Sequence, residues 1–276
     1  MNGPVVGIIG SPVGHSLTPI LQQAAFRELG LSWQSTAFEV GSGGGEAAVE
    51  AMKSLGIRGL SVTMPLKEEV AAAADVLSPE AKALDSVNCL SLERGQVIGF
   101  STDGDGLLDA LHRSHGLDPH GRSVAILGAG GAARSIAEAF GRRGARSVVV
   151  VARRPEEALR CAALAGGAGR PGGPAEGAEC DVVVNATPVG MGGTTSQNSP
   201  ALVAASDLQS RALAVDLVYH PIETPWLLAA KNAGCEIAGG LGMLVHQAAL
   251  QIERWTDHDA PLEAMWASVE NSFGSR

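Results

Sequence analysis

A strand, a glycine-rich turn and the start of a helix follow one another without interruption at residues 124–133, and this run constrains the fold more than any other feature of the chain. Four apolar residues form a buried-strand pattern, after which Gly128, Gly130 and Ala133 match the spacing GxGxxG/A. In that pattern the first glycine permits a tight turn, the second lets the backbone approach a pyrophosphate, and the small third residue keeps the helix close to the sheet. The N-terminus of the helix adds N–H groups and a dipole that favour negative charge. The run therefore predicts a Rossmann-like unit that binds a dinucleotide through residues Gly128, Ala129, Gly130, Gly131 and Ala132; the alternative is a glycine turn without a ligand.

The residues after the next predicted strand indicate which dinucleotide is bound. NAD sites usually place an acidic residue at the end of that strand, but here Val151 is followed by Ala152-Arg153-Arg154. Two guanidinium groups suit a 2′-phosphate, so Arg153 and Arg154 predict NADP, with a solvated basic pair as the alternative. Farther along, Thr187 follows another apolar strand and is a candidate for the nicotinamide side, although Asn, Thr and Pro are also ordinary turn residues.

Strand-like and helix-like segments alternate along the whole chain, which predicts an α/β protein with mostly parallel sheets. One series runs from Val5 to Phe100, with a hairpin turn at Arg94-Gly95, and a second begins at Ser123. The stretch 165–178 is interpreted as a surface loop. Two final helical patterns have no strand of their own and are expected to cover the first sheet. We therefore expect a discontinuous substrate-binding domain (1–104 and 240–276), an inserted dinucleotide-binding domain (105–239), and a cleft between them.

Composition excludes several other classes of protein. With 45% hydrophobic and 18% charged residues, the 276-residue chain is suited to compact domains rather than to disorder. Its net charge of −9 and lack of a Lys/Arg cluster argue against nucleic acid as a partner. The four cysteines lie far apart without a CxxC pair, so we predict buried free thiols in a reducing compartment and no metal site. Because neither a signal-peptide pattern nor a membrane-length apolar run is present, we expect a cytoplasmic protein, monomeric or homodimeric, whose partner is a small molecule.

Two residues from distant parts of the chain are candidates for proton transfer. Lys67 follows the predicted strand 59–63, at the end of a parallel strand where ligands bind in open α/β sheets. A lysine there can donate a proton to a developing alkoxide and recover it. Asp103 follows the hairpin, and its carboxylate could orient that ammonium group. The alternatives are an exposed lysine at a helix start and an aspartate that caps a helix.

Two hydroxyl residues near the N-terminus suggest a site for a carboxylate. Thr18 is expected to be the N-cap of a helix that has Pro19 in its first turn. Ser16 and Thr18 can also point their hydroxyl groups toward an anion beside the helix N-terminus. His15 is interpreted as structural. The local sequence around Asn88 does not distinguish a role in ligand binding from a structural role.

Several motifs in register resemble the shikimate dehydrogenase family over nearly the whole chain. The motifs are Gly14-His15-Ser16-Leu17-Thr18-Pro19, Ser61-Val62-Thr63-Met64-Pro65-Leu66-Lys67, Val87-Asn88, Ser101-Thr102-Asp103-Gly104, the glycine turn, Asn185-Ala186-Thr187-Pro188, Asp216-Leu217-Val218-Tyr219 with Thr224-Pro225, and Gly240-Leu241-Gly242-Met243-Leu244-Val245-His246-Gln247. The resemblance implies an NADPH-dependent, reversible reduction of 3-dehydroshikimate to shikimate, a step toward chorismate and the aromatic amino acids. A quinate/shikimate dehydrogenase that uses NAD(P), or a non-catalytic nucleotide sensor on the same fold, are the alternatives.

The resemblance also implies a role for each matching residue. Lys67 and Asp103 would be the catalytic pair, and Ser16 and Thr18 would hold the substrate carboxylate. Ring hydroxyl groups would be met by Thr63, Lys67, Asn88, Asp103 and Gln247. Tyr219 would close on the substrate side, and Gly240 and Met243 would lie near the nicotinamide, although a methionine in an apolar helix is commonly a core residue. The chain differs from the common family pattern at Thr18 (often serine), Ser61 (often asparagine) and 152–154 (usually Asn-Arg-Thr).

Overall fold

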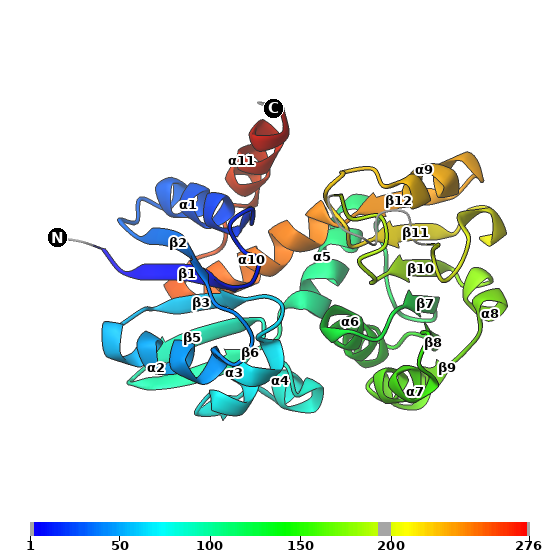
Figure 1. Cartoon of the computed structure of the whole chain (residues 1–276). Helices are drawn as coiled ribbons and strands as arrows, with labels where there is room; N and C mark the ends of the chain where they lie inside the picture. The colour runs from blue at the N-terminus through cyan, green and yellow to red at the C-terminus, as the bar shows by residue number, and fades with distance from the viewer. Residues whose placement is uncertain (1–2, 193–199, 275–276) are drawn as a thin grey trace. The chain divides into compact units, whose positions relative to one another are not determined.

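The structure, a computed structural model, describes residues 3–192 and 200–274 and divides into two compact units (Figure 1). The first unit combines Met1–Thr102 with Val245–Arg276, and the second is Asp103–Leu244. Helix α10 (Leu241–Thr256) begins in the second unit and continues into the first. Each unit contains a six-stranded sheet with helices, so the predicted α/β class is confirmed.

The sheet of the second unit has the strand order of a Rossmann fold. Its six strands run in parallel in the order β12-β11-β10-β7-β8-β9. Numbered from β7, this is the order 3-2-1-4-5-6, in which the direction of winding reverses between β7 and β10. Ligands bind at the carboxyl ends of the strands beside such a reversal. The strands are β7 (Ser123–Leu127), β8 (Ser147–Val151), β9 (Gly169–Pro171), β10 (Val182–Asn185), β11 (Leu213–Asp216) and β12 (Glu236–Gly239).

Helices cover both faces of this sheet, which explains why its central strands are continuous apolar runs. In β8, Val148 and Val150 belong to one buried cluster, whereas Val149 and Val151 belong to a cluster on the opposite face. The α-helices of this unit are α5 (Asp103–His115), α6 (Gly131–Arg142), α7 (Pro155–Ala163), α8 (Pro174–Ala178) and α9 (Pro225–Asn232), together with the start of α10.

The interpretation of 165–178 as a surface loop is wrong. This stretch contains a short 3-10 helix (Gly166–Ala168), strand β9 and helix α8. Strand β9 has only three residues and a composition typical of turns, and it is extended because it pairs with β8 (Val149 opposite Arg170). Neither periodicity nor propensity reveals an edge strand that depends on such pairing.

The sheet of the first unit has the order β2-β1-β3-β5-β6-β4. Strands β1 and β3 are parallel, with Ile9 opposite Val62, and β5 and β6 form the predicted antiparallel hairpin. Both turn residues, Arg94 (φ 51°) and Gly95 (φ 82°), are left-handed, as the tight turns favoured by twisted hairpins require. The strands are β1 (Val5–Gly10), β2 (Gln34–Glu39), β3 (Gly59–Val62), β4 (Val76–Leu77), β5 (Cys89–Glu93) and β6 (Gln96–Phe100).

The two C-terminal helices pack on the first unit, as predicted. The Trp255 indole in α10 donates a hydrogen bond to the Leu90 carbonyl (3.0 Å). A Cβ atom at Gly59 would lie 2.3 Å from the Trp255 ring, so this glycine allows the indole to lie against β3. The other helices of the unit are α1 (Thr18–Glu28), α2 (Gly45–Leu55), α3 (Lys67–Ala73), α4 (Pro79–Leu84) and α11 (Leu262–Gly274).

Candidate active site

The loops that follow β1 and β3 lie side by side at the carboxyl edge of the first sheet. The Thr63 amide donates to the Ile9 carbonyl (3.0 Å), and the Ser11 amide donates to the Met64 carbonyl (2.9 Å). At Gly10, with φ 158°, a Cβ atom would lie 2.3 Å from the Thr63 methyl group, so only glycine allows this close approach. The parallel register thus brings the segment carrying Ser16 and Thr18 to the same edge as Thr63 and the start of α3.

At the start of α1 the hydroxyl group of Ser16, rather than that of Thr18, pairs with a backbone N–H. The prediction that Thr18 is the N-cap is wrong, because the helix begins at Thr18 and its cap residue, Leu17, makes no side-chain bond. The Ser16 hydroxyl accepts the Thr18 N–H (3.2 Å). In this arrangement the Ser16 hydroxyl can still donate its hydrogen to an anion. Thr18 is 2% exposed, so its added methyl group is enclosed by protein.

Lys67 is the first residue of α3, directly after the turn that ends β3. Its carbonyl accepts the Val87 N–H (3.0 Å), which fixes the start of α3 against the segment leading into β5. The side chain is half-buried. A lysine at the carboxyl end of a parallel strand, on a fixed backbone, is positioned to act on a ligand bound at this edge.

Asn88, Thr102 and Gln247 come together at the same edge from three separate parts of the sequence. Asn88 Nδ2 donates to Thr102 Oγ1 (3.0 Å) and to Gln247 Oε1 (3.4 Å), and Asn88 Oδ1 accepts the Thr102 N–H (2.7 Å). Thr102 Oγ1 also donates to the Gln247 carbonyl (3.2 Å). All three residues are less than 10% exposed. The first unit thus brings together Ser16, Thr18, Thr63, Lys67, Asn88 and Gln247 at one edge of its sheet.

Asp103 belongs to the second unit and is 7% exposed at the start of α5. The next residue, Gly104, donates its N–H to Ser135 Oγ of α6 (2.9 Å). A Cβ atom at Gly104 would lie 2.4 Å from the Ser135 carbonyl oxygen, so this glycine permits the contact of α5 with α6. Asp103 is therefore held by the same helix that begins at the glycine turn.

The glycine turn fits a dinucleotide phosphate. Gly128 has φ 110°, and a Cβ atom there would lie 3.2 Å from atoms of Ala186 and Thr187, so the protein itself requires this glycine. Gly130 is different, because its φ of −75° suits any residue and a Cβ atom would meet no described protein atom within 4 Å. The fold does not require Gly130, whereas a phosphate held against the backbone of the helix start does.

Substitution of Gly130 by Val is expected to weaken NADP binding without destabilising the protein. The side chain would occupy the space of the phosphate, and the lost charge-assisted bonds correspond to a dissociation constant raised roughly 10–150-fold. Calorimetric titration and thermal unfolding of the same samples measure the two quantities. The matched control is Gly167→Val, because Gly167 in the same unit also has open space at its Cβ position. Equal NADP affinity in both variants would contradict a phosphate site at Gly130.

The two candidate arginines differ in their surroundings. Arg154 forms an ion pair with Glu157 (2.5 Å), whose carboxylate is also 4.0 Å from Arg160. Arg153 is exposed at the end of β8, and no ion pair of it is found among the described residues. The charge of Arg154 is thus partly compensated by α7 itself, which makes Arg153 the stronger candidate for a 2′-phosphate contact.

A buried carboxylate that the sequence analysis did not assign holds the loop after β10. Asp216, fully buried at the end of β11, accepts Asn185 Nδ2 (3.0 Å), the Val218 N–H (3.0 Å) and Thr224 Oγ1 (2.7 Å). Asn185 Oδ1 in turn accepts the Thr187 hydroxyl (2.6 Å). Burial raises the pKa of Asp216, against the effect of its three donors. The only sequence signal for this residue was its place in a motif that carries Tyr219.

Tyr219, Gly240 and Met243 all belong to the second unit. Tyr219 is half-buried, and desolvation raises the pKa of its phenol. A Cβ atom at Gly240 would lie 2.1 Å from the Leu217 carbonyl oxygen, so this glycine lets the start of α10 approach the end of β11. Met243 is 8% exposed and belongs to a core cluster, the structural role considered for it from the sequence. Their roles toward a ligand stay predictions.

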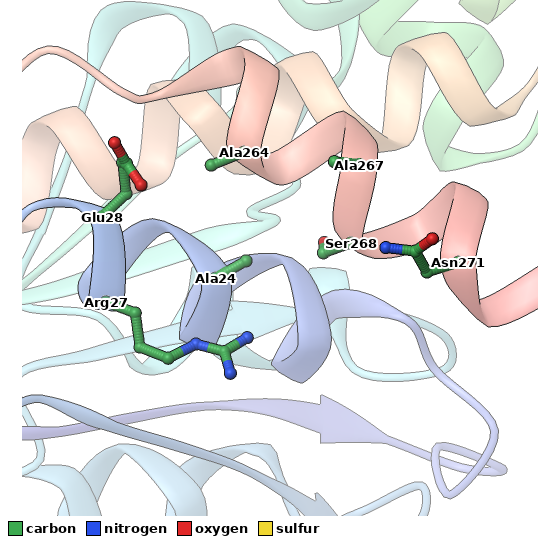
Figure 2. A pocket seen from close by; sticks show the side chains of 7 residues that line it. All are labelled: Ala24, Arg27, Glu28, Ala264, Ala267, Ser268 and Asn271. Carbon is green, nitrogen blue, oxygen red and sulfur yellow. The ribbon is translucent and has the colours of Figure 1, made fainter.

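A pocket in the first unit lies away from these candidate residues. It lies between α11 and the C-terminal half of α1, whereas Thr18 begins that helix (Figure 2). Its lining is Ala24, Arg27, Glu28, Ala264, Ala267, Ser268 and Asn271.

Among the described residues, no group of three or more His, Cys, Asp or Glu side chains is gathered that could hold a metal ion. No helix in residues 3–192 or 200–274 has the length and apolar character needed to span a bilayer.

Comparison with known proteins assigns the chain to a family. The model of the shikimate dehydrogenase substrate binding domain matches residues 8–90, and that of the shikimate 5′-dehydrogenase C-terminal domain matches residues 240–270. A third model, of coenzyme F420-dependent NADP oxidoreductases, matches residues 123–211. A shikimate dehydrogenase (NADP(+)) of Methanopyrus kandleri is 41% identical over 275 residues, which cover 96% of this chain and 94% of that protein. The chain belongs to the shikimate dehydrogenase family.

Solved structures of shikimate dehydrogenases agree with this assignment. The shikimate 5-dehydrogenase of Thermus thermophilus in complex with NADP(H) and shikimate superposes with a TM-score of 0.89 at 33% identity, covering 97% of this chain and 99% of that one. The 5-ketofructose reductase of a Gluconobacter strain is also similar, with a TM-score of 0.86 at 29% identity, covering 98% of both chains. The fold of shikimate dehydrogenases therefore serves more than one substrate, and the identity of the substrate depends on the site residues.

Proposed function

We propose that this chain catalyses the reversible, NADPH-dependent reduction of 3-dehydroshikimate to shikimate, a step toward chorismate and the aromatic amino acids. The observation that supports this most strongly is the gathering of Ser16, Thr18, Thr63, Lys67, Asn88 and Gln247 at one sheet edge of the first unit. These side chains offer hydroxyl, amide and ammonium groups, which suit a carboxylate and several ring hydroxyl groups. The relatives named for this reaction support the same assignment.

In this proposal each group of residues has a defined task. Ser16 and Thr18 bind the substrate carboxylate beside the N-terminus of α1, and Thr63, Asn88, Tyr219 and Gln247 meet the rest of the ring. Lys67 donates a proton to the carbonyl oxygen as it becomes a hydroxyl group, and Asp103 orients the ammonium group. The nicotinamide, when bound, supplies the hydride to the carbonyl carbon. The first unit is the substrate domain and the second unit the dinucleotide domain, so the boundaries expected at 104/105 and 239/240 lie instead at 102/103 and 244/245.

We propose NADP rather than NAD as the cofactor. The open space at Gly130 supports a phosphate site at the glycine turn. Residues Gly128, Ala129, Gly130, Gly131 and Ala132 would hold the pyrophosphate, Arg153 and Arg154 the 2′-phosphate, and Thr187, Gly240 and Met243 the nicotinamide side. The four cysteines are free and buried, which supports a cytoplasmic location.

Turnover assays of the purified protein test the proposed function directly. Shikimate and quinate are each supplied with NADP⁺ and with NAD⁺, and nucleotide reduction is followed by absorbance. We expect the highest kcat/KM for shikimate with NADP⁺. A preference for quinate or NAD⁺ would favour a quinate/shikimate dehydrogenase, for which the methyl group of Thr18 would be a reason. Binding of NADP without turnover of either acid would favour a nucleotide sensor.

Removal of the Arg153 side chain is expected to reduce the preference for NADP. Loss of hydrogen bonds between a guanidinium group and a phosphate corresponds to a KM for NADP⁺ raised roughly 10–150-fold, with the KM for NAD⁺ unchanged. Arg154→Ala is the matched control and should have the smaller effect, because Glu157 already compensates the charge of Arg154. Steady-state kinetics with both nucleotides distinguish the two variants. The reverse order of effects would assign the 2′-phosphate to Arg154 instead.

A further inference from the structure

A directional series of hydrogen bonds runs through the interior of the first unit from β2 to α10. Ser35 Oγ donates to Gln22 Oε1 (2.5 Å), and Gln22 Nε2 donates to Ser61 Oγ (2.9 Å). Ser61 Oγ then donates to Gln251 Oε1 (2.5 Å), and Gln251 Nε2 donates to Gln247 Oε1 (2.7 Å). We call the three buried members of this series, Gln22, Ser61 and Gln251, the amide relay. Because every donor points toward Gln247, each bond polarises the next in the same sense.

The amide relay is enclosed by protein. Gln22 and Gln251 are fully buried and Ser61 is 3% exposed. Burial of an amide group is unfavourable unless its donors and acceptors are paired, so a buried polar network specifies its geometry tightly when it is satisfied. Ser61 and Gln251 are separated by 190 residues in the sequence, and their bond joins β3 to α10 directly.

Two backbone groups determine which way the side-chain amides point. The Asn88 carbonyl can only accept a hydrogen bond, and it lies 3.2 Å from the Gln251 terminal atom, which must therefore be Nε2. The Thr102 N–H can only donate, and it lies 2.7 Å from the Asn88 terminal atom, which must be Oδ1, so Asn88 Nδ2 faces Gln247. Both nitrogen donors meet the same atom of Gln247. That atom is therefore Oε1, assigned independently from two sides.

From this geometry we infer that Gln251, supported by Ser61 and Gln22, is a positioning residue that fixes the amide orientation of Gln247. With Oε1 occupied by two donors, Gln247 acts on substrate through Nε2, as a hydrogen-bond donor to an oxygen atom. The inference rests on the proposed function, in which Gln247 meets the substrate ring. Without Gln251 the Gln247 Oε1 atom loses the shorter of these two bonds (2.7 Å, against 3.4 Å from Asn88), so the amide is held less firmly in the orientation that the substrate needs.

The test replaces Gln251 by Met, which has a similar length and no amide group. The KM for shikimate should rise roughly 5–30-fold, as for loss of one oriented hydrogen bond, with kcat and the KM for NADP⁺ unchanged. In a Gln247→Ala background the same substitution should have no further effect on KM, because Gln251 acts only through Gln247. Gln23→Met is the matched control. Gln23 neighbours Gln22 on α1, but its amide bonds to two backbone groups outside the amide relay, the Trp33 carbonyl (3.3 Å) and the Ser35 N–H (3.4 Å).

Two outcomes would overturn the inference. One is an unchanged KM in Gln251→Met, and the other is an equal rise of KM in the wild-type and Gln247→Ala backgrounds, which would indicate general loosening. A second measurement needs no turnover: hydrogen exchange of the Gln247 side-chain amide, followed by nitrogen-15 NMR, should be faster in Gln251→Met than in Gln23→Met. If the wild-type protein fails to turn over shikimate, the proposed function fails, and the exchange rates still decide whether Gln251 orients Gln247.

Discussion

Substitution of Lys67 by Ala should lower kcat for shikimate oxidation by about 10²–10⁴-fold, the range for loss of a general acid–base group. Lys67 begins α3 at the carboxyl end of β3, and its carbonyl is fixed by the Val87 N–H, so removal of the side chain leaves its backbone held. The expected effect is therefore on chemistry rather than on folding. NADP affinity should not change, because the glycine turn belongs to the second unit. Steady-state kinetics and calorimetric NADP titration measure the two effects.

A suitable control for this experiment is Lys82→Ala. Lys82 is an exposed lysine of the same unit, on α4, and it should retain full activity. Asp103→Asn provides the companion test, because it keeps the shape of the side chain and removes the charge that would orient the Lys67 ammonium group. Retention of wild-type kcat by Lys67→Ala would assign proton transfer to another group. A loss of NADP binding in the same variant would place Lys67 in a structural role.

The features that could be predicted from the sequence are those specified by neighbouring residues. Residues 124–133 contain a strand, a turn and a helix start in one run, and Arg94-Gly95 has the residue types that a tight hairpin needs. The Rossmann order was harder to predict, because β9 and β12 at the two edges are extended only through pairing with β8 and β11. The strand propensity of a short segment does not reveal such pairing.

In the candidate site too, residues with a distinctive local sequence could be proposed, whereas residues that depend on distant contacts could not. Lys67, Asp103 and the glycines could be proposed from the sequence because their chemistry and local context are distinctive. The amide relay was not found, since Gln22, Ser61 and Gln251 are ordinary polar residues whose significance arises from contacts across large separations in sequence. The N-cap prediction for Thr18 failed for a related reason. The N–H groups that an N-cap Thr18 side chain would accept, those of Ile20 and Leu21, are both paired with the Leu17 carbonyl (3.1 Å each), and Ser16 Oγ accepts the N–H of Thr18 itself.

Substitution of Asp216 by Ala should lower the free energy of unfolding by about 3 kcal/mol or more, because each buried donor left without an acceptor costs roughly 1–3 kcal/mol. The substitution leaves Asn185 Nδ2, the Val218 N–H and the Thr224 hydroxyl without their shared acceptor in a fully buried place. Asn185 positions the Thr187 hydroxyl, so the KM for NADP⁺ should also rise. Urea unfolding and steady-state kinetics measure these effects. A variant as stable as the wild type would show that the three donors find other partners.

Replacement of Asp216 by Asn separates its charge from its hydrogen bonds. Burial raises the pKa of Asp216 in the folded protein, so the unfolded chain loses this proton first as the pH rises. The contribution of Asp216 to stability is therefore greatest below its unfolded pKa, near 4, and falls as the pH rises through the folded pKa. The Asn side chain does not titrate. Between the unfolded and the folded pKa of Asp216, the free energy of unfolding of the wild type, taken relative to that of Asp216→Asn, should therefore fall by at most about 1.4 kcal/mol per pH unit. Urea unfolding of both proteins across a pH series above 4 tests this, and parallel stability curves would mean that the three donors cancel the effect of burial.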